Sequence, residues 1–238
     1  MPEPPGRLRY SFIRYGLRLL IACYLRVRVE HARLLPEQQN FLVCFSHPNW
    51  VDPMLVVGYW PDQRWVYIFG PRERDMKVGL RNRVIRWGRI GVPFKPSAHD
   101  LLDTTRRALW VLDRYILAVA GEGRLSDRDG AIVALEEGPA YLALRAGVPI
   151  VPLAVIGTRW LRFGKRVTLR FGEPLSTEGR RADRATMTAL TAELTAALEK
   201  LLEGVREEPP PGPFGRWLTD VFNERPWLDE GFQGTKPR

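Results

Sequence analysis

The sequence contains few of the residues that build disulfide frameworks or zinc sites. Only two cysteines, Cys23 and Cys44, and three histidines occur among its 238 residues. Both cysteines lie inside apolar runs, which is typical of buried thiols in a reducing compartment rather than of disulfides. A structural zinc site usually needs four Cys or His ligands, so this composition argues against one and we expect no metal site.

The sequence also lacks a hydrophobic run long enough to cross a membrane in the ordinary way. The N-terminal segment is rich in aromatic and aliphatic residues, but its longest uncharged stretch covers only residues 19–25, whereas a spanning helix needs about 20 apolar residues. No small-residue cleavage site follows, which argues against a signal peptide. Arg7, Arg14 and Arg18 fall on one helical face, opposite an apolar one. The segment is therefore interpreted as an amphipathic helix that lies in a membrane interface, or alternatively packs on the protein's own core.

Acidic residues are scarce in two strongly basic segments. Residues 64–95 carry nine Lys and Arg against two acids, and residues 159–170 carry five Lys and Arg with no acid. The whole chain has a formal net charge of +9. Such segments indicate an anionic partner, which could be a membrane surface, a phosphorylated substrate or a nucleic acid. The alternative is solvated helix faces with no partner.

Buried strands alternate with helices along most of the chain, which predicts one α/β domain with a mixed, largely buried sheet flanked by helices. Strands are expected at 27–35, 41–45, 65–69, 90–94, 115–120, 148–156 and 167–171. Helices are expected at 54–60, 76–87, 101–112, 139–146 and 182–205. We therefore divide the chain into a membrane-interface segment (1–29), a catalytic domain (30–206), and a proline-rich connector with an aromatic tail (207–238) that docks on the body or the membrane.

A histidine and an aspartate bracket the turn that follows the strand expected at 41–45. His47 and Asp52 are close enough in sequence for a tight turn to bring the carboxylate back onto one imidazole nitrogen. The second nitrogen then remains available as a base, as in a hydrolytic triad without the protein nucleophile. Such a pair suits reactions in which a hydroxyl of the substrate attacks. The alternative is a helix-capping aspartate near an unrelated histidine.

A second polar motif, Gly-Glu-Gly-Arg, follows the strand expected at 115–120. Gly121 and Gly123 let the backbone approach a ligand closely. Arg124 offers a planar fork suited to a phosphate, and Glu122 can hold that arginine or a hydroxyl. The alternative is an ordinary surface turn in which Arg124 pairs with a nearby aspartate.

Taken together, the two motifs resemble those of the glycerolipid acyltransferase family, whose prototype is 1-acyl-glycerol-3-phosphate acyltransferase. The family's His-x4-Asp motif is matched by His47 and Asp52, and its Phe-Pro-Glu-Gly motif by Glu122 and Gly123 only. The Pro-Ile-Val-Pro strand and the Gly-Thr pair after it resemble the family's fourth block. The resemblance covers residues 26–175.

The resemblance implies which residues form the site. His47 and Asp52 would be catalytic, and the substrate-binding residues would be Asn49, Lys95, Glu122, Gly123 and Arg124. Three departures from the family pattern concern the acceptor. Ala120-Gly121 replaces the Phe-Pro pair, Lys95 is the nearest cation where the family's second block usually ends in arginine, and Glu136-Glu137 replaces a lysine often seen before the next glycine.

The resemblance predicts an O-acyltransferase that moves a fatty acyl group from acyl-CoA or acyl carrier protein to the hydroxyl of lysophosphatidic acid, giving phosphatidic acid. The donor is a substrate, so no cofactor is expected. One alternative is a different lysolipid or other lipid acceptor, and another is a non-catalytic basic protein that binds membranes. No groove-reading motif is evident, so we expect no nucleic-acid partner. The expected location is an anionic membrane surface, as a peripheral or monotopic protein on the cytoplasmic face of the cell membrane.

Overall fold

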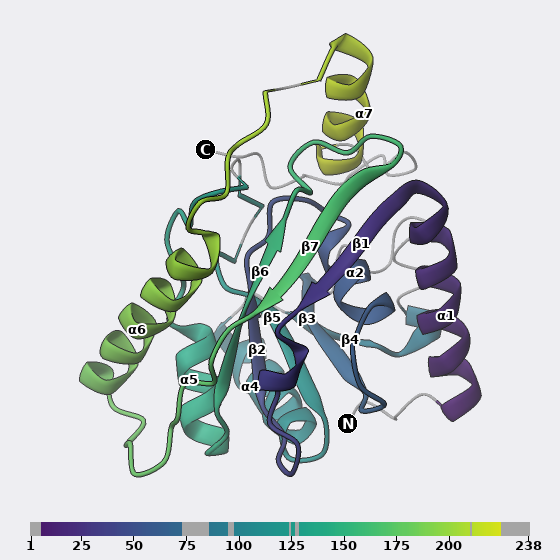
Figure 1. Cartoon of the computed structure of the whole chain (residues 1–238). Helices are drawn as coiled ribbons and strands as arrows, with labels where there is room; N and C mark the ends of the chain where they lie inside the picture. Colours follow the sequence, from purple (N-terminus) through teal and green to yellow (C-terminus); the bar gives the residue numbers. More distant parts are fainter. Residues whose placement is uncertain are drawn as a thin grey trace.

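Seven strands form one twisted sheet through the molecule (Figure 1). The computed structural model describes residues 6–72, 86–94, 98–123, 125–126, 129–209 and 211–224. The strand order is β1-β7-β6-β2-β5-β3-β4, and neighbours run parallel except β6 and β7, which are antiparallel. The strands are β1 (Leu25–Glu30), β2 (Leu42–Phe45), β3 (Val66–Arg72), β4 (Gly91–Phe94), β5 (Ile116–Ala120), β6 (Ile150–Ile156) and β7 (Lys165–Phe171).

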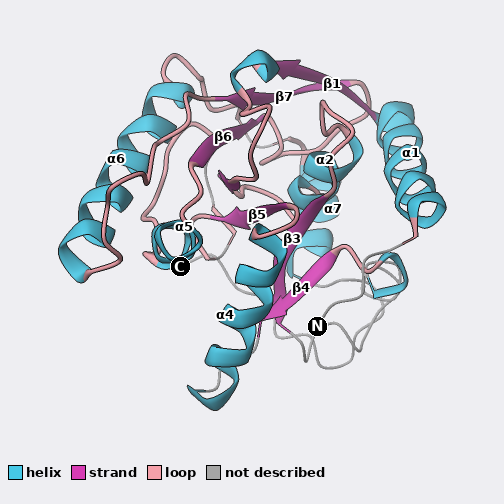
Figure 2. Ribbon diagram, turned by 90° about the horizontal axis from the view of Figure 1, so that it is seen from below, coloured by secondary structure: helices cyan, strands magenta, loops and turns pink. Residues whose placement is uncertain are grey.

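Helices cover both faces of this sheet (Figure 2). On one face lie α1 (Arg7–Tyr24) and α2 (Asp52–Gly58), and on the other lie α4 (Ala98–Leu112), α5 (Gly138–Ala146) and α6 (Arg184–Leu202). A further helix, α7 (Pro213–Glu224), lies beyond the end of the sheet at the top of Figure 1. The two helical layers give the molecule two apolar cores, one on each side of the sheet.

The central strands are apolar along their length because helices cover both of their faces. All four residues of β2 are fully buried. Helix α6 buries Leu190, Leu194 and Leu198, whose spacing places them on one helical face. It begins where Asp183 Oδ1 accepts the backbone N–H of Thr186 at 2.8 Å, a capping bond that fixes the start of the helix.

The predicted fold class is confirmed, with a single α/β domain, a mixed sheet and an N-terminal helix. The strand expected at 27–35 is shorter than predicted and ends at Glu30. The chain turns at His31, whose φ of 59° is left-handed, and a 3₁₀ turn follows at Ala32–Leu34. A left-handed residue cannot continue a strand, so the apolar pattern beyond it belongs to the turn.

Of the expected helices, one differs in extent from the prediction and one lies mostly outside the described residues. The helix expected at 182–205 is Arg184–Leu202. The basic helix expected at 76–87 lies outside the described residues, except for its last two positions. At the N-terminus, β1 already begins at Leu25, so the end of the segment 1–29 belongs to the sheet.

Helix α1 uses one side to pack on the body of the protein. Ile13 is buried in the core next to α2, and the hydroxyl of Tyr10 accepts the backbone N–H of Val66 at 3.0 Å. Arg14 also points inward, where its guanidinium donates to the carbonyl of Trp60 at 2.6 Å. The basic face inferred from the sequence is therefore turned partly toward the protein.

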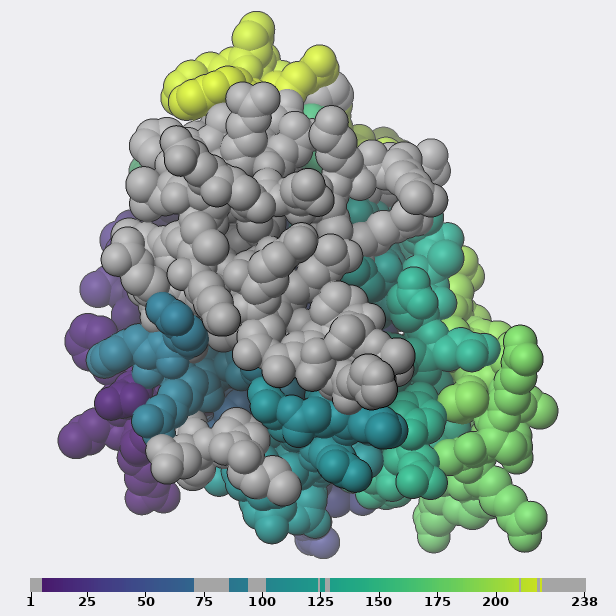
Figure 3. Space-filling view, turned by 180° about the vertical axis from the view of Figure 1, so that it is seen from behind, coloured from purple at the N-terminus to yellow at the C-terminus, as the bar shows by residue number. Residues whose placement is uncertain are grey.

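The other side of α1 exposes a stripe of large apolar side chains. We call this set the outer stripe; its members are Leu8, Phe12, Tyr15, Leu19 and Leu20, each more than half exposed. The ring of Phe12 makes an edge contact with the half-exposed Trp87. In the view from behind, α1 and α6 form opposite edges of the molecule (Figure 3). Within the described part of the chain, no helix is long and apolar enough to cross a membrane.

Candidate active site

The His47 motif occupies the turn between the buried strand β2 and the helix α2. Ser46 begins the turn, and its hydroxyl accepts the backbone N–H of Val155 at 2.9 Å, which fastens the end of β2 to β6. The ring of His47 lies edge-on to Phe45, with 5.7 Å between centroids. Asp52 is the first residue of α2. The turn is therefore held at both ends by regular structure, and its polar side chains have fixed positions.

His47 and Asp52 form a hydrogen-bonded pair. The distance between His47 Nδ1 and Asp52 Oδ2 is 3.0 Å, and the same carboxylate oxygen accepts the backbone N–H of Asn49 at 2.6 Å. The Asp52 side chain is completely buried, whereas that of His47 is 15% exposed. Asp52 therefore engages Nδ1 of the imidazole and leaves Nε2 as the nitrogen that a substrate can reach.

Burial raises the pKa of Asp52, because an isolated carboxylate is poorly solvated there. His47, the nearby hydroxyl of Thr158 and the backbone N–H of Asn49 act in the opposite direction and lower this pKa. Thr158 is also fully buried. Within the described residues, neither Asp52 Oδ1 nor Thr158 Oγ1 makes a hydrogen bond of standard geometry, so the hydroxyl of Thr158 acts on this carboxylate through its dipole.

The Gly-Glu-Gly motif lies beside this pair because β5 is the parallel neighbour of β2. The carboxyl ends of parallel strands meet at one edge of a sheet, which brings two motifs distant in sequence together. The N–H of Gly121 donates to the carbonyl of Phe45 at 3.0 Å, and the N–H of Ser126 donates to the carbonyl of His47 at 2.8 Å. The loop after β5 is thus bonded directly to the His47 turn.

The departure from the family's Phe-Pro pair has a structural explanation at Gly121. A Cβ atom there would lie 2.6 Å from Cys44 Sγ and 2.8 Å from a methyl group of Leu135. Proline also has no N–H to donate to Phe45. The close packing of this chain therefore suits glycine. Gly123 has a left-handed φ of 64°, which glycine adopts without strain.

The structure places the predicted substrate-binding residues unequally. Glu122 is buried. Burial of the Cys44 thiol raises its pKa, and the charge of Glu122 adds to this rise. Asn49 is completely buried, and its side-chain oxygen accepts the backbone N–H of Val51 at 3.2 Å. This bond shapes the turn, so a role in substrate binding stays a prediction. Lys95 and Arg124 lie outside the described residues, and their roles also stay predictions.

One residue at the site escaped the sequence analysis. Asp129 is buried, and its Oδ1 accepts the backbone N–H of Arg159 at 2.9 Å. Burial, and to a smaller extent the charge of the nearby Asp52, raises the pKa of Asp129 to about 6. The sequence shows Asp129 only as one of several charged residues in a polar loop, so nothing in the local pattern identifies it as buried.

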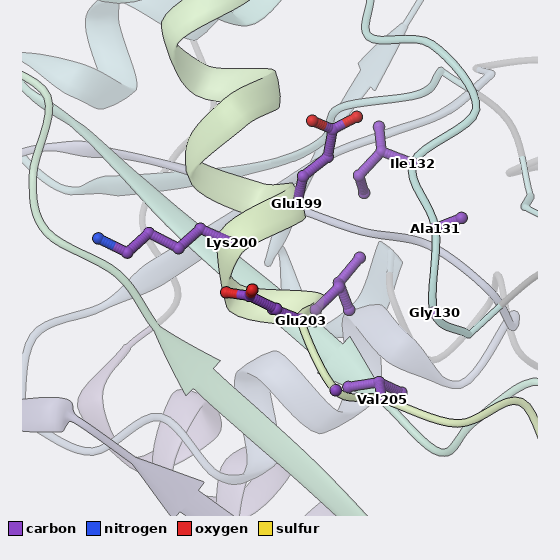
Figure 4. A pocket seen from close by; sticks show the side chains of 9 residues that line it. Gly130, Ala131, Ile132, Glu199, Lys200, Glu203 and Val205 are labelled. Atoms are coloured by element: carbon purple, nitrogen blue, oxygen red, sulfur yellow. The ribbon is translucent and has the colours of Figure 1, made fainter.

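A shallow depression of about 520 Å³ lies at the end of α6 (Figure 4). Glu199 and Lys200 of α6 and Glu203 just after it line the depression opposite residues 130–132. Glu199 lies beside Ile132, whereas Lys200 points away (Figure 4). The lining includes neither member of the His–Asp pair. We therefore place the chemistry at the His47 turn and not in this depression.

Comparisons with known proteins agree with this geometry. A family model described as Acyltransferase matches residues 26–156, more than half of the chain, and includes both polar motifs. The crystal structure of the 1-acyl-sn-glycerophosphate (LPA) acyltransferase PlsC from Thermotoga maritima has a similar fold, with a TM-score of 0.63. The identity is 21%, and the match covers 82% of this chain and 78% of that chain. None of the curated proteins matches. From the family match and the arrangement of its motifs, we conclude that the chain belongs to the acyltransferase family.

Proposed function

We propose that this acyltransferase moves a fatty acyl group from a thioester, either acyl-CoA or acyl carrier protein, to the free hydroxyl of lysophosphatidic acid, giving phosphatidic acid. The family match supports acyl transfer. The likeness to PlsC, which is an LPA acyltransferase, supports the choice of acceptor. The observation that carries the proposed chemistry is the 3.0 Å contact between His47 Nδ1 and Asp52 Oδ2.

The proposed reaction is a direct transfer with His47 as general base. Nε2 removes the proton from the acceptor hydroxyl as its oxygen attacks the thioester carbonyl. The carbon–sulfur bond then breaks, and the imidazolium returns the proton to the leaving thiolate. Asp52 holds the ring in one tautomer and stabilises its positive charge. General acid–base catalysis of this kind contributes about a hundredfold to ten-thousandfold.

A second candidate keeps the chemistry but changes the acceptor to another lysolipid or lipid. The observation in its favour is the start of the β5 loop, where Gly121 packs against Cys44 in place of the family's proline. This loop leads into Glu122 and Gly123, which the family resemblance assigns to substrate binding. A different loop backbone at that point is compatible with a different headgroup.

Two matched substitutions test the base, and an acceptor panel tests the substrate. His47→Asn should lower acyl transfer at least about a hundredfold, while His31→Asn, at an exposed left-handed position that asparagine tolerates, should leave it unchanged. Each protein is assayed with a radiolabelled acyl thioester and several lysolipids. Transfer by His47→Asn above about a tenth of wild type would contradict the base assignment, and preference for an uncharged acceptor would contradict the lysophosphatidic acid proposal.

The proposal includes attachment to an anionic membrane surface, as a peripheral or monotopic protein on the cytoplasmic face. The outer stripe of α1 supports this attachment, because exposed apolar patches of this kind mark interaction surfaces. Arg7 and Arg18 are exposed at either end of the stripe, where they could meet anionic headgroups. Arg14 cannot take part, since it is buried against Trp60. Burial of the apolar outer stripe should therefore contribute more to membrane binding than the contacts of arginines with headgroups.

Flotation with lipid vesicles tests this surface. Phe12→Glu should reduce binding to vesicles of phosphatidylcholine with phosphatidylglycerol at least tenfold, because a charge must then enter the apolar layer. Leu102→Glu is the matched control, since Leu102 is also an exposed apolar residue but lies on α4, on the opposite face of the sheet. Equal losses of vesicle binding in both variants, or no loss of vesicle binding in Phe12→Glu, would contradict attachment through the outer stripe.

A further inference from the structure

We infer that Asp129 is a positioning residue for acyl transfer: it fixes the turn after β6, which carries Thr158, and the same loop is bonded to the backbone of His47, the proposed base. The inference rests on the proposed function of His47. It adds a carboxylate that lies outside both sequence motifs and that touches neither the reacting atoms nor the imidazole.

The first link runs from Asp129 to the turn that joins β6 and β7. Asp129 Oδ1 accepts the N–H of Arg159 at 2.9 Å, and the N–H of Gly157 faces the same carboxylate. Gly157 has a left-handed φ of 89°, and a Cβ atom there would lie 2.7 Å from the carbonyl oxygen of Arg166. The turn therefore has a conformation that requires glycine, and two of its N–H groups point at one buried acceptor.

The second link runs from this turn to the catalytic pair. Thr158 stands between the two residues whose N–H groups face Asp129, and its side chain is fully buried. Its hydroxyl lies near the carboxylate of Asp52 and lowers the pKa of that group. Asp52 in turn holds His47 Nδ1 at 3.0 Å. Displacement of the turn would thus remove a favourable dipole from the carboxylate that orients the base.

The same loop segment also holds the histidine side of the pair. The N–H of Ser126, three positions before Asp129, donates to the carbonyl of His47 at 2.8 Å. One short piece of chain is therefore bonded to His47 through its backbone and to the Thr158 turn through a side chain. This double attachment explains why a hydrogen-bond acceptor, the carboxylate of Asp129, is buried at this position of the loop after β5.

The role belongs to the acceptor oxygen of Asp129 rather than to its charge. Asp129 faces a carboxylate on α2, that of Asp52, and the ammonium group of Lys165 on β7, which is itself buried and donates to the carbonyl of Trp160 at 2.7 Å. Burial raises the pKa of Asp129 to about 6. An amide oxygen in the same place can accept the N–H of Arg159 equally well. Asparagine should therefore replace this aspartate, and alanine should not.

Steady-state kinetics of the whole protein, with radiolabelled acyl-CoA and lysophosphatidic acid, test this role. Asp129→Ala should lower kcat about ten- to hundredfold with both KM values within about twofold of wild type, because only the orientation of the base changes. Asp129→Asn should recover at least half of the wild-type kcat. Asp113→Ala, which removes a well-exposed carboxylate elsewhere, is the matched control and should change neither constant.

A second readout does not depend on turnover. The hydrogen-bonded Nδ1 proton of His47 should give a downfield proton resonance, assigned by its loss in His47→Asn. We expect this resonance in wild type and Asp129→Asn, and its broadening or loss in Asp129→Ala. Wild-type kcat and an unchanged resonance in Asp129→Ala would overturn the inference, as would a low kcat in Asp129→Asn, which would make the charge the active feature.

A folding defect in Asp129→Ala would not end the test. Thr158→Val removes only the hydroxyl that the turn places near Asp52 and keeps the shape of the side chain. It should lower kcat about tenfold and broaden the same resonance, and no change in either would overturn the inference. If the wild type transferred no acyl group to any acceptor, the proposed function would fail, whereas the resonance would still report whether Asp129 positions the pair.

Discussion

Asp129→Asn also separates the charge of this residue from its hydrogen bond in a measurement of stability. The carboxylate is 4% exposed and accepts the N–H of Arg159 at 2.9 Å. Burial is the largest influence on its pKa, which rises from 3.8 to about 6, and the charge of Asp52 adds to the rise. Bonds to backbone N–H groups and the charge of Lys165 oppose it. Asparagine keeps an oxygen for the N–H and removes the buried charge.

The sign of the effect follows from proton binding. The unfolded chain releases this proton near pH 3.8, whereas the folded protein keeps it until about pH 6. Between these values the folded state binds more protons, so this group makes the protein less stable as the pH rises. A pKa difference of about 2 corresponds to roughly 3 kcal/mol. The free energy of unfolding of Asp129→Asn, minus that of wild type, should therefore increase by roughly 3 kcal/mol between pH 3.5 and pH 8.

Urea unfolding at several pH values, followed by tryptophan fluorescence, measures this difference. Carboxylates remote from Asp129 titrate equally in both proteins, so their contributions cancel. Among the described residues, Asp52 is the one carboxylate whose charge is seen to couple to this position. Asp113→Asn is the control, because Asp113 is well exposed. Its free energy of unfolding, minus that of wild type, should not change with pH. A flat difference for Asp129→Asn would refute the reasoning, since it would mean that the buried carboxylate is ionised as easily in the folded protein as in the unfolded chain.

Two further substitutions test packing and catalysis. Gly121→Ala should lower the free energy of unfolding by about 1–3 kcal/mol, because its Cβ would lie 2.6 Å from Cys44 Sγ. Adding Cys44→Ala should recover part of this loss, as measured by urea unfolding. Purely additive losses of stability in the double variant would contradict the clash. Asp52→Asn should lower kcat at least about a hundredfold with little change in the thermal midpoint, because the amide gives no charge to the imidazolium. A kcat within threefold of wild type would show that Asp52 only fastens the N–H of Asn49.

The contact between His47 and Asp52 could be predicted from the sequence because its geometry is local. His47 and Asp52 lie on a single short turn between a buried strand and a helix, and few backbone paths join such elements. The proximity of Glu122 required the strand order as well. It follows from the pairing of β2 with β5, which the alternation of strands and helices permits but does not dictate. Only the family resemblance joined the two motifs before the structure was known.

The orientation of α1 and the role of Asp129 could not be predicted, for physical reasons that differ. Helix α1 carries apolar residues almost all round, so helical spacing alone does not decide whether Ile13 or Phe12 faces the core. For the same reason the spacing predicts one basic face for Arg7, Arg14 and Arg18, although Arg14 donates to the carbonyl of Trp60 inside the protein. Asp129 differs from the other acids of its loop only in the long-range contact with Arg159, which no local pattern encodes.

Within the described residues, no hydroxyl or thiol is seen hydrogen-bonded to the His47 ring, and this bears on the kinetics expected for the proposed mechanism. In the described part of the chain, His47 makes its one side-chain hydrogen bond to Asp52 and none to a hydroxyl or thiol. Cys44 is fully buried with a raised pKa, and the hydroxyl of Ser46 is bonded to the backbone of Val155. Neither can receive the acyl group with the help of the base.

In the mechanism proposed above, the acyl group passes directly between two substrates that are bound together. Initial rates measured against donor concentration, at several fixed concentrations of acceptor, should give intersecting rather than parallel double-reciprocal lines. Mixing enzyme with acyl-CoA alone should release no burst of free CoA. Parallel lines, or a burst equal to the enzyme concentration, would reveal an acyl-enzyme and would refute the assignment of His47 as a base acting on the acceptor itself.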